Sequence, residues 1–213
     1  MNKYRLGLLT CAAFFCSNVY ADGWFVRPVI GTSFMSDTSG TSLNVDSVTG
    51  SVDVDLNTGF NAGLGIGYRY NKNWASEFYW EYRTNDSTVD LAGQSNFNDG
   101  NYASNIFYIN THYILTPESN WKTYLGAGLG WVQEVDIDLE RGGVEQSYSG
   151  DGSVAWQLFL GTEKDIAENL SFQAELRYGR VSGIDLDGEG VPGTLMDLDY
   201  TTTTVQVGLR YEF

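Results

Sequence analysis

The sequence has little cysteine, little positive charge and no long apolar run beyond its first residues, and each shortage excludes a class of protein. Its 213 residues include two cysteines and one histidine, with 12 basic against 27 acidic residues. This acidic balance argues against nucleic-acid binding, which needs basic patches, and against contact with bare anionic lipid unless divalent cations intervene. No P-loop, nucleophile elbow, paired-histidine zinc motif or dinucleotide fingerprint is present. We therefore predict a protein that is not an enzyme and has no metal or cofactor.

The first residues have the order of a secretory signal peptide. Lys3 and Arg5 form a short basic region, and the apolar stretch that follows, 6–16, is too short to span a bilayer. Val19 and Ala21 then supply small residues at the two positions that a signal peptidase reads. An uncleaved membrane anchor would need a longer apolar run. We expect export and removal of this segment.

Cleavage after Ala21 divides the chain into a signal peptide, 1–21, and a mature domain, 22–213. A lipoprotein cut before Cys11 is the alternative, but it leaves an unusually short signal. Both cysteines, Cys11 and Cys16, leave with the signal peptide, so the mature domain has no disulfide, no thiol nucleophile and no cysteine metal site. Two basic residues leave as well, so the balance becomes 10 basic against 27 acidic residues, or −17.

Apolar and polar residues alternate with a period of two along the mature domain, which predicts β-strands. In the clearest segment, Phe60, Leu64 and Tyr68 share one face and glycines occupy the other. No helical periodicity competes with this pattern. Eight strands are expected, at 24–34, 59–70, 74–84, 102–115, from 121 onward, 156–163, 170–178 and 203–213.

The connections between these segments alternate strictly in length. Three short turns, at 71–73, 116–120 and 165–169, alternate with four long segments, one of them a polar loop at 87–100. This pattern is typical of outer-membrane barrels, with short turns in the periplasm and long loops outside. The predicted fold is all-β, an eight-stranded antiparallel up-and-down transmembrane β-barrel.

A soluble β-sandwich also alternates, but its outward faces would be polar. Here the apolar faces are too aromatic to leave in water, and the opposite faces carry Arg, Glu, Asn and Gln. Lipid outside and a polar interior explain both faces. Aromatic residues near the predicted strand ends favour the same arrangement, because they suit membrane interfaces. Inward glycines, as in 62–68 and 125–131, leave room for large groups on neighbouring strands.

Three motifs carry a resemblance to a known family. Together with the signal peptide, the Gly-Trp-Phe-Val-Arg opening at Gly23, the glycine-alternating segment 126–130 and the closing segment 207–213 resemble the opacity-type, outer-membrane-protein-A-like barrels of Gram-negative bacteria. The resemblance covers the whole mature domain and implies insertion in the cell outer membrane. It also implies that Phe213 helps the outer-membrane assembly machinery to recognise the chain. The family includes adhesins, structural proteins and porin-like proteins, so it does not fix an activity.

Charged residues at inward positions predict a network in the lumen. An eight-stranded barrel is just wide enough for its own side chains, and isolated buried charges cost so much that they should pair. The network is either a static polar core or a gate that rearranges to pass ions. Its predicted members are Arg27, Arg69, Arg83, Arg177, Arg210, Glu77, Glu81, Glu163, Glu175 and Glu212.

His112 is the only histidine and is predicted to face the lumen near a periplasmic turn. A catalytic histidine needs a nucleophile or water, a partner and access to substrate. Barrel enzymes that cut surface lipids or peptides work from the outer half, so this position favours a hydrogen-bonding lumen residue.

Three Asp-alternating segments continue the strand pattern past the expected membrane band. If the register is unbroken, their aspartates point inward and form a carboxylate-lined mouth that attracts cations and binds calcium weakly. The alternative is a set of solvated acidic loops. The residues are Asp53, Asp55, Asp136, Asp138, Asp185 and Asp187. A similar segment, 196–199, has the opposite parity, so a bulge or loop is expected there.

These features favour a non-enzymatic integral outer-membrane protein with a structural or adhesin-like role carried by its long loops. A narrow cation-preferring pore gated by the lumen charges is the alternative, and a lipid- or peptide-modifying enzyme is a weaker one. The expected partners are outer-membrane lipid and lipopolysaccharide, the assembly machinery and a host or surface ligand at the loops. We expect a monomer.

Overall fold

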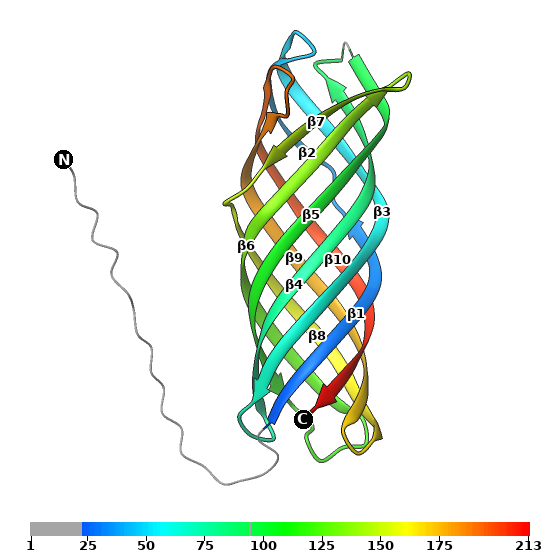
Figure 1. Ribbon diagram of the computed structural model, residues 1–213, viewed down its shortest axis with the longest axis vertical. Helices are drawn as coiled ribbons and strands as arrows, with labels where there is room; N and C mark the ends of the chain where they lie inside the picture. Colours follow the sequence, from blue (N-terminus) through cyan, green and yellow to red (C-terminus); the bar gives the residue numbers. More distant parts are fainter. Residues whose placement is uncertain (1–22, 94) are drawn as a thin grey trace, which may run out of the picture.

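The computed structural model describes residues 23–93 and 95–213, and these residues form ten antiparallel strands that close into one tall barrel (Figure 1). The predicted signal peptide lies outside the described residues. Within the described ranges, no helix is long and apolar enough to cross a bilayer. The strands are β1 (Gly23–Met35), β2 (Thr38–Val45), β3 (Val48–Arg69), β4 (Trp74–Leu91), β5 (Ser95–Ile114), β6 (Lys122–Arg141), β7 (Val144–Gly150), β8 (Val154–Ala167), β9 (Leu170–Gly188) and β10 (Thr194–Glu212).

The ten strands occupy eight positions around the ring. β1 and β2 lie one above the other between β3 and β10. β7 and β8 share the position between β6 and β9 in the same way. Each of the other six strands fills a position alone, and every neighbouring pair is antiparallel. The predicted eight-stranded up-and-down barrel is therefore confirmed, with two of its strands interrupted.

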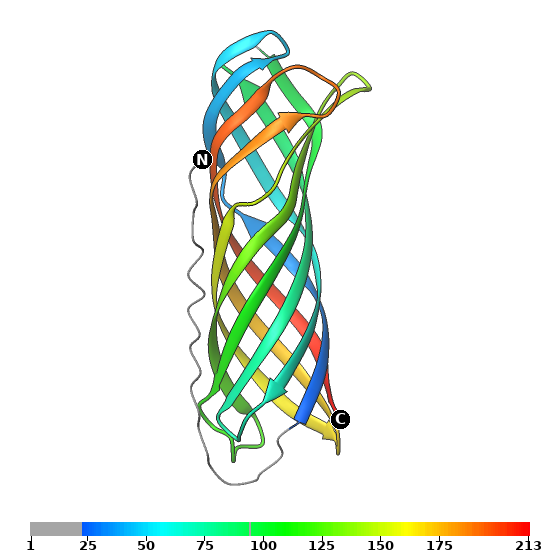
Figure 2. The ribbon, with the colours of Figure 1, turned by 60° about the vertical axis from the view of Figure 1, so that its left-hand side comes forward.

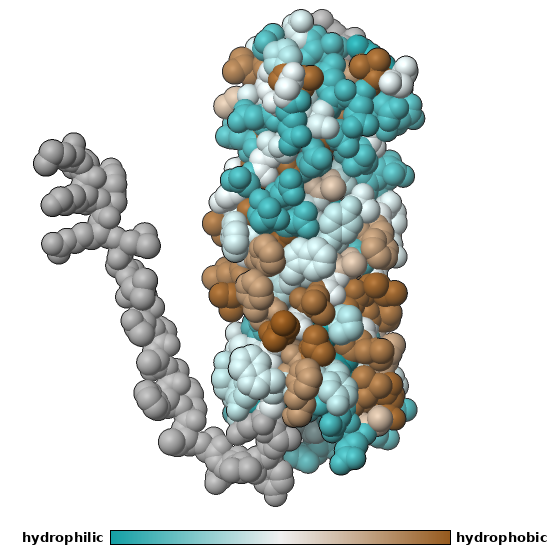
Figure 3. All heavy atoms as spheres, viewed as in Figure 1, coloured by the Kyte–Doolittle hydropathy of each residue, from teal (hydrophilic) through white to brown (hydrophobic). Residues whose placement is uncertain are grey.

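The lower half of the barrel, which holds the C-terminus, has an apolar outside and a polar inside. Ile109 and Leu129 on the outer wall are 68% and 70% exposed, whereas Arg27 and Glu77 on the inner wall are 1% and 2% exposed. Apolar residues form a broad band over this half on the face seen in Figure 3. Such a wall suits hydrocarbon outside and a polar lumen, as the alternation predicted.

The four segments predicted as long loops are mostly strand, and this prediction was wrong. Their hairpins continue the ladders of the lower half and raise the barrel wall (Figure 2). The connections at this end are only two to five residues long, at 46–47, 92–94, 142–143 and 189–193. The predicted polar loop at 87–100 is thus largely the end of β4 and the start of β5. We call the upper part, residues 37–56, 86–105, 134–153 and 180–199, the extension.

The extension reverses the polarity of the lower half. Val52, Val54 and Leu56 on β3 are at most 5% exposed, while Asp53 and Asp55 between them are exposed. The predicted inward orientation of the aspartates is therefore wrong in all three segments: Asp53, Asp55, Asp136, Asp138, Asp185 and Asp187 lie on the outer wall, and their apolar neighbours fill the interior. The extension has the core of a water-soluble protein, with apolar side chains inside and carboxylates outside, and such a wall suits water and not lipid.

Bulges between the halves produce this reversal. Leu56 and Asn61 are both buried on the inner wall of β3 although one position is even and the other odd, and the β3–β4 register shifts between them. Val132 and Val135 on β6 show the same shift. One extra residue moves every following side chain to the opposite wall. The bulge expected near 196–199 is confirmed by a register shift between Leu195 and Leu198.

Inward glycines of the lower half make room for large side chains from the next strand. A Cβ atom at Gly63 would overlap the Tyr79 hydroxyl, and one at Gly126 would overlap the Phe159 ring. The role predicted for these glycines is confirmed. A narrow lumen can hold aromatic and charged groups because alternate strands contribute no side chain at those positions.

Replacing an inward and an outward neighbour on β3 tests the reversed polarity of the extension. Leu56→Ala should lower the free energy of unfolding by about 2–5 kcal/mol, because it leaves a cavity in the interior. Asp55→Ala should change it by less than about 0.5 kcal/mol, because Asp55 is on the water-facing wall. Urea unfolding in detergent micelles, followed by far-UV circular dichroism, measures both. A larger loss for Asp55→Ala would return the aspartates to the interior.

Candidate functional site in the lumen and the extension

All ten charged residues predicted for the lumen lie inside the lower half of the barrel. Nine of them are at most 6% exposed, and only the Glu212 side chain reaches 31% exposure. Five arginines face five glutamates, so the lumen has no net charge. The structure brings these residues together in three groups stacked along the barrel axis.

The central group has four charged members. The Nε and Nη2 atoms of Arg27 each donate to a Glu77 carboxylate oxygen at 2.7 Å, and Arg177 Nη2 lies 2.6 Å from Glu175 Oε1. Arg27 Nη1 lies 3.6 Å from Glu175 Oε2, which joins the two pairs. Two parallel N–H···O bonds fix both side chains of the Arg27–Glu77 pair in one geometry.

Neutral residues that the sequence analysis did not select complete this group. Asn110 Nδ2 donates to Glu77 at 3.0 Å, Gln157 Nε2 donates to Asn110 at 2.7 Å, and Gln206 Nε2 donates to Glu175 at 2.7 Å. The Tyr79 ring lies between two arginines, 5.3 Å from Arg27 and 4.4 Å from Arg177. The signal that could have found them is their inward parity on strands already assigned.

Two smaller groups lie below and above the central one. Near the C-terminal end, Glu163 lies 3.1 Å from Arg69 and 3.3 Å from Arg210, and Glu212 lies 3.1 Å from each of these arginines. Toward the extension, Arg83 Nη2 lies 2.7 Å from Glu81 Oε1 and donates to Thr204 Oγ1 at 3.3 Å. The three groups satisfy charges that would be costly if left unpaired.

His112 belongs to the central group and is buried. Its Nε2 lies 3.3 Å from Glu77 Oε2, and its ring centroid lies 4.8 Å from that of Phe159. At 4% exposure the imidazole has little access to solvent. The geometry is that of a lumen hydrogen-bonding residue.

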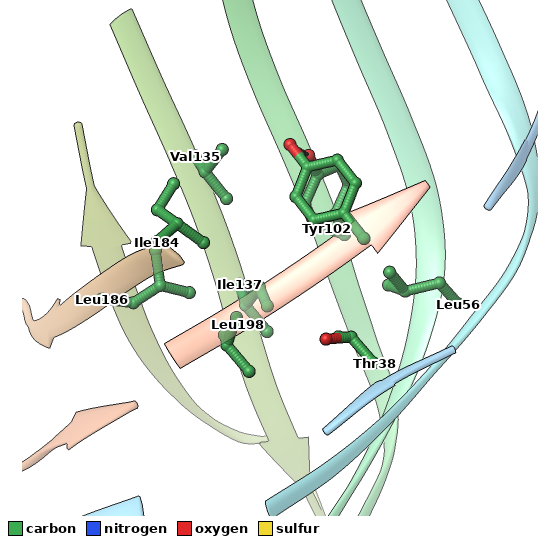
Figure 4. A pocket seen from close by; sticks show the side chains of 9 residues that line it. Thr38, Leu56, Tyr102, Val135, Ile137, Ile184, Leu186 and Leu198 are labelled. Carbon is green, nitrogen blue, oxygen red and sulfur yellow. Dashed lines mark hydrogen bonds between the residues drawn. The ribbon is translucent and has the colours of Figure 1, made fainter. Parts of the chain in front are cut away.

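An apolar plug fills the extension directly above the charged groups. Its side chains point inward from β3, β5, β6, β9 and β10 (Figure 4), and the space among them is too small for a water molecule. At its base the Tyr102 and Tyr200 hydroxyls are hydrogen-bonded at 2.5 Å. The plug consists of Leu56, Tyr102, Val135, Ile137, Ile184, Leu186, Leu198 and Tyr200, each at most 5% exposed.

The outer wall of the extension carries almost all the net charge of the mature domain. Within the ranges that define it, the sequence has 18 acidic residues and two basic ones, Arg141 and Arg180, a balance of −16. Both arginines are already paired, with Asp46 at 2.8 Å and with Asp199 at 2.9 Å. The three lysines of the described residues lie instead at the opposite end, where Lys72 pairs with Glu118 and Lys122 with Asp165. A strongly negative surface therefore projects from one end only.

An acidic groove of about 410 Å³ lies on this surface beside the interruption between β7 and β8. Glu134, Asp151, Asp185 and Asp187 line it together with polar groups. The nearby Asp136 has a pKa raised to about 6, first by desolvation and then by the negative charges of its neighbours. The six aspartates of the predicted weak cation site are spread over this wall and not around a mouth. In the described part of the chain no three acidic or metal-ligating side chains are grouped to hold a metal ion.

Residues 7–213 match the family model described as outer membrane protein beta-barrel domain. The chain belongs to this outer-membrane β-barrel family. It is an integral protein of the Gram-negative cell outer membrane, so the lower half of the barrel lies in the bilayer and the resemblance seen in the sequence is confirmed.

Known proteins similar to this chain differ widely from it in sequence. Uncharacterised proteins of Brucella abortus and Brucella melitensis are 26% identical over 242 residues, covering 90% of this chain and 85% of theirs. The outer membrane protein OprG from Pseudomonas aeruginosa superposes with a TM-score of 0.63 at 16% identity, covering 91% of this chain and 96% of OprG. Neisserial surface protein A has a TM-score of 0.54 at 18% identity, covering 90% and 97%. At these identities the solved structures show the barrel fold alone.

Removing one partner of the central Arg27–Glu77 pair tests how far the barrel depends on a neutral lumen. Arg27→Met should lower the free energy of unfolding by about 3–5 kcal/mol, because it leaves the Glu77 carboxylate buried and unpaired. The double variant with Glu77→Gln should recover most of this loss. Urea unfolding in micelles measures the three proteins. Arg141→Met, which removes a half-exposed pair at the tip, is the control and should cost less than about 1 kcal/mol; a similar loss in both arginine variants would contradict the argument.

Proposed function

We propose that this protein is a closed, non-conducting and non-enzymatic outer-membrane barrel that displays an acidic extension at the cell surface. The observation that carries the proposal is that side chains fill the barrel interior at two successive levels. Paired charges fill the membrane-embedded lumen, and the apolar plug fills the extension above it. A water path would require both to rearrange. The structural or surface-interaction role thus belongs to the outer wall of the extension and not to long loops.

The charge of this wall defines the partners we propose. A surface with a balance of −16 repels bare phosphate groups but binds them through shared divalent cations. Lipopolysaccharide bridged by such cations is therefore the first proposed partner, and a cationic host or surface ligand is the second. Among the described residues, the outward face of the lower half is largely apolar, which supports a monomer in lipid. Phe213, 76% exposed at the end of the closing strand, remains the proposed signal for the assembly machinery.

A narrow cation-preferring pore is the second candidate. The acidic outer wall would concentrate cations at such a pore, and the Arg–Glu groups would be its gate. A lipid- or peptide-modifying enzyme has less support, because His112 is buried among aromatic rings and hydrogen-bonded to Glu77.

Single-channel recording separates a sealed barrel from a gated pore. The purified protein in planar bilayers should show no reproducible conductance steps, because the plug leaves no space for water. The refolded, monodisperse protein has to be used, with an open porin as the positive control. Steps that Arg177→Ala abolishes or Glu81→Gln changes would establish the gate and overturn the sealed barrel.

Divalent-cation removal tests the proposed contact with lipopolysaccharide. In liposomes containing lipopolysaccharide, EDTA should lower the Tm of the barrel by several degrees, because it removes the ions that bridge carboxylates and phosphates. A variant with asparagine at positions 53, 55, 136, 138, 185 and 187 keeps the interior and should lose this response. Liposomes of phospholipid alone are the control. An equal EDTA effect in both lipids would show direct ion binding without lipopolysaccharide.

A further inference from the structure

The seam between β7 and β9 is the shortest ladder in the barrel wall. β7 pairs with β6 over the seven residues from Val144 to Gly150, but with β9 at only two positions, Tyr148 with Gly188 and Ser149 with Asp187. One further backbone bond, from Glu189 N to Ser147 O at 2.9 Å, supports it. Below the interruption, by contrast, β8 pairs with β9 at twelve positions. Since each lost ladder position removes backbone hydrogen bonds, this seam has the fewest of them among the strand pairs described in the extension.

Carboxylates lie on both sides of this seam and face the same water. Glu134, Asp136 and Asp138 follow one another on the outer wall of β6, and Asp185, Asp187 and Glu189 stand on the β9 side. The negative charges that act on Asp136 come from Asp138, Glu189, Glu134 and Glu145, and no basic group is among them. Like charges on the same outer wall repel one another across β7, and this repulsion works against the short ladder.

The hydrogen-bond donors around Asp136 are taken by other carboxylates. Asn101 Nδ2 donates to Asp138 at 3.0 Å, and Ser147 Oγ donates to the same carboxylate. On the neighbouring strands, Asn105 Nδ2 donates to Glu134 at 3.4 Å and Ser149 Oγ donates to Glu189 at 2.6 Å.

Asp136 itself is left with an inaccessible Oδ1 that makes no hydrogen bond to the described residues. The residues directly opposite it are Ala103 on β5 and Ser149 on β7. The carboxylate form of Asp136 therefore lacks a hydrogen bond at Oδ1. The protonated carboxyl could instead donate a hydrogen bond from this oxygen.

We propose that the β7–β9 seam is a charge-controlled latch, which the outer-wall carboxylates loosen when charged and tighten when Asp136 is protonated or the charges are screened. Leu186, one residue from the Ser149–Asp187 pair of the seam, is buried and lines the apolar plug together with Val135 and Ile184. Loosening it therefore uncovers the interior of the extension, and tightening it seals that interior. This device goes beyond the proposed function, because a sealed barrel needs no moving seam.

The pH range of the latch follows from the raised pKa of Asp136. A carboxyl whose pKa is about 6 in the folded protein, against about 3.9 when unfolded, favours the closed seam in its protonated form. The stability that protonation of Asp136 adds to the closed seam is complete below the pKa of the unfolded state. It disappears as the pH rises through about 6, the pKa in the folded protein. Because Asp136 is partly exposed, solvent screening makes the stabilisation of the closed seam smaller than the full pKa shift of Asp136 implies.

Hydrogen exchange read by mass spectrometry tests the latch on the full mature barrel in nanodiscs. Peptides covering 144–150 and 184–189 should be about tenfold more protected at pH 5.0 than at pH 7.0, after correction for intrinsic exchange rates. Asp136→Asn should give most of that protection already at pH 7.0 and lose most of the pH response. Raising sodium chloride to about 1 M at pH 7.0 should also increase protection in the wild-type protein.

Asp55→Asn is the matched control, because it removes one charge from β3 on the opposite side of the ring. It should leave the pH response of the seam peptides unchanged. Equal protection at the two pH values, or an equal effect of the two asparagine variants, would overturn the latch. Conductance plays no part in this readout, so the outcome is independent of whether the barrel is sealed.

Discussion

The medium outside the wall is the constraint on which the rest of this structure depends. In the lower half, hydrocarbon accepts only apolar side chains, so the polar face of every strand must turn inward. Charges enclosed in a narrow lumen must then pair, and five arginines and five glutamates do so. In the extension, water outside lets the same alternation bury apolar residues. One chain thus builds two cores of opposite polarity.

Joining these two cores requires a change of register at the water interface. Bulges on β3, β6 and β9 move the following side chains to the other wall. β4 has no such bulge, and its odd-numbered residues point inward in both halves. The inward residues instead change in type, from Asn85 and Ser87 to Val89 and Leu91. The interruption between β7 and β8 belongs to the same level, and it creates both the acidic groove and the short β7–β9 ladder.

The distribution of charge follows from the same constraint and links the fold to the proposed role. The lumen is neutral by pairing, and lysine–carboxylate pairs lie at the lower turns, so almost all the net charge is left to the extension. Its outward aspartates alternate with the residues of the plug, so the segments that seal the barrel also present its negative surface. A closed interior and an acidic exterior are therefore two faces of the same strands.

The period-two alternation was enough to predict the eight ring positions, the lipid-facing residues and the ten lumen charges. It is a local property of the chain, because successive side chains of a strand point to opposite faces. The pairing partners, such as Arg27 with Glu77 fifty residues away, came only from the tertiary structure, since register and shear decide which inward residues meet. The orientation of the aspartates in the extension was predicted wrongly, because a bulge is hard to recognise in a sequence. It nevertheless moves the side chain of every following residue to the opposite face of the strand. Val-Asp-Val-Asp at 52–55 reads the same with either face inward, and only the position of the segment above the membrane decides which face meets water.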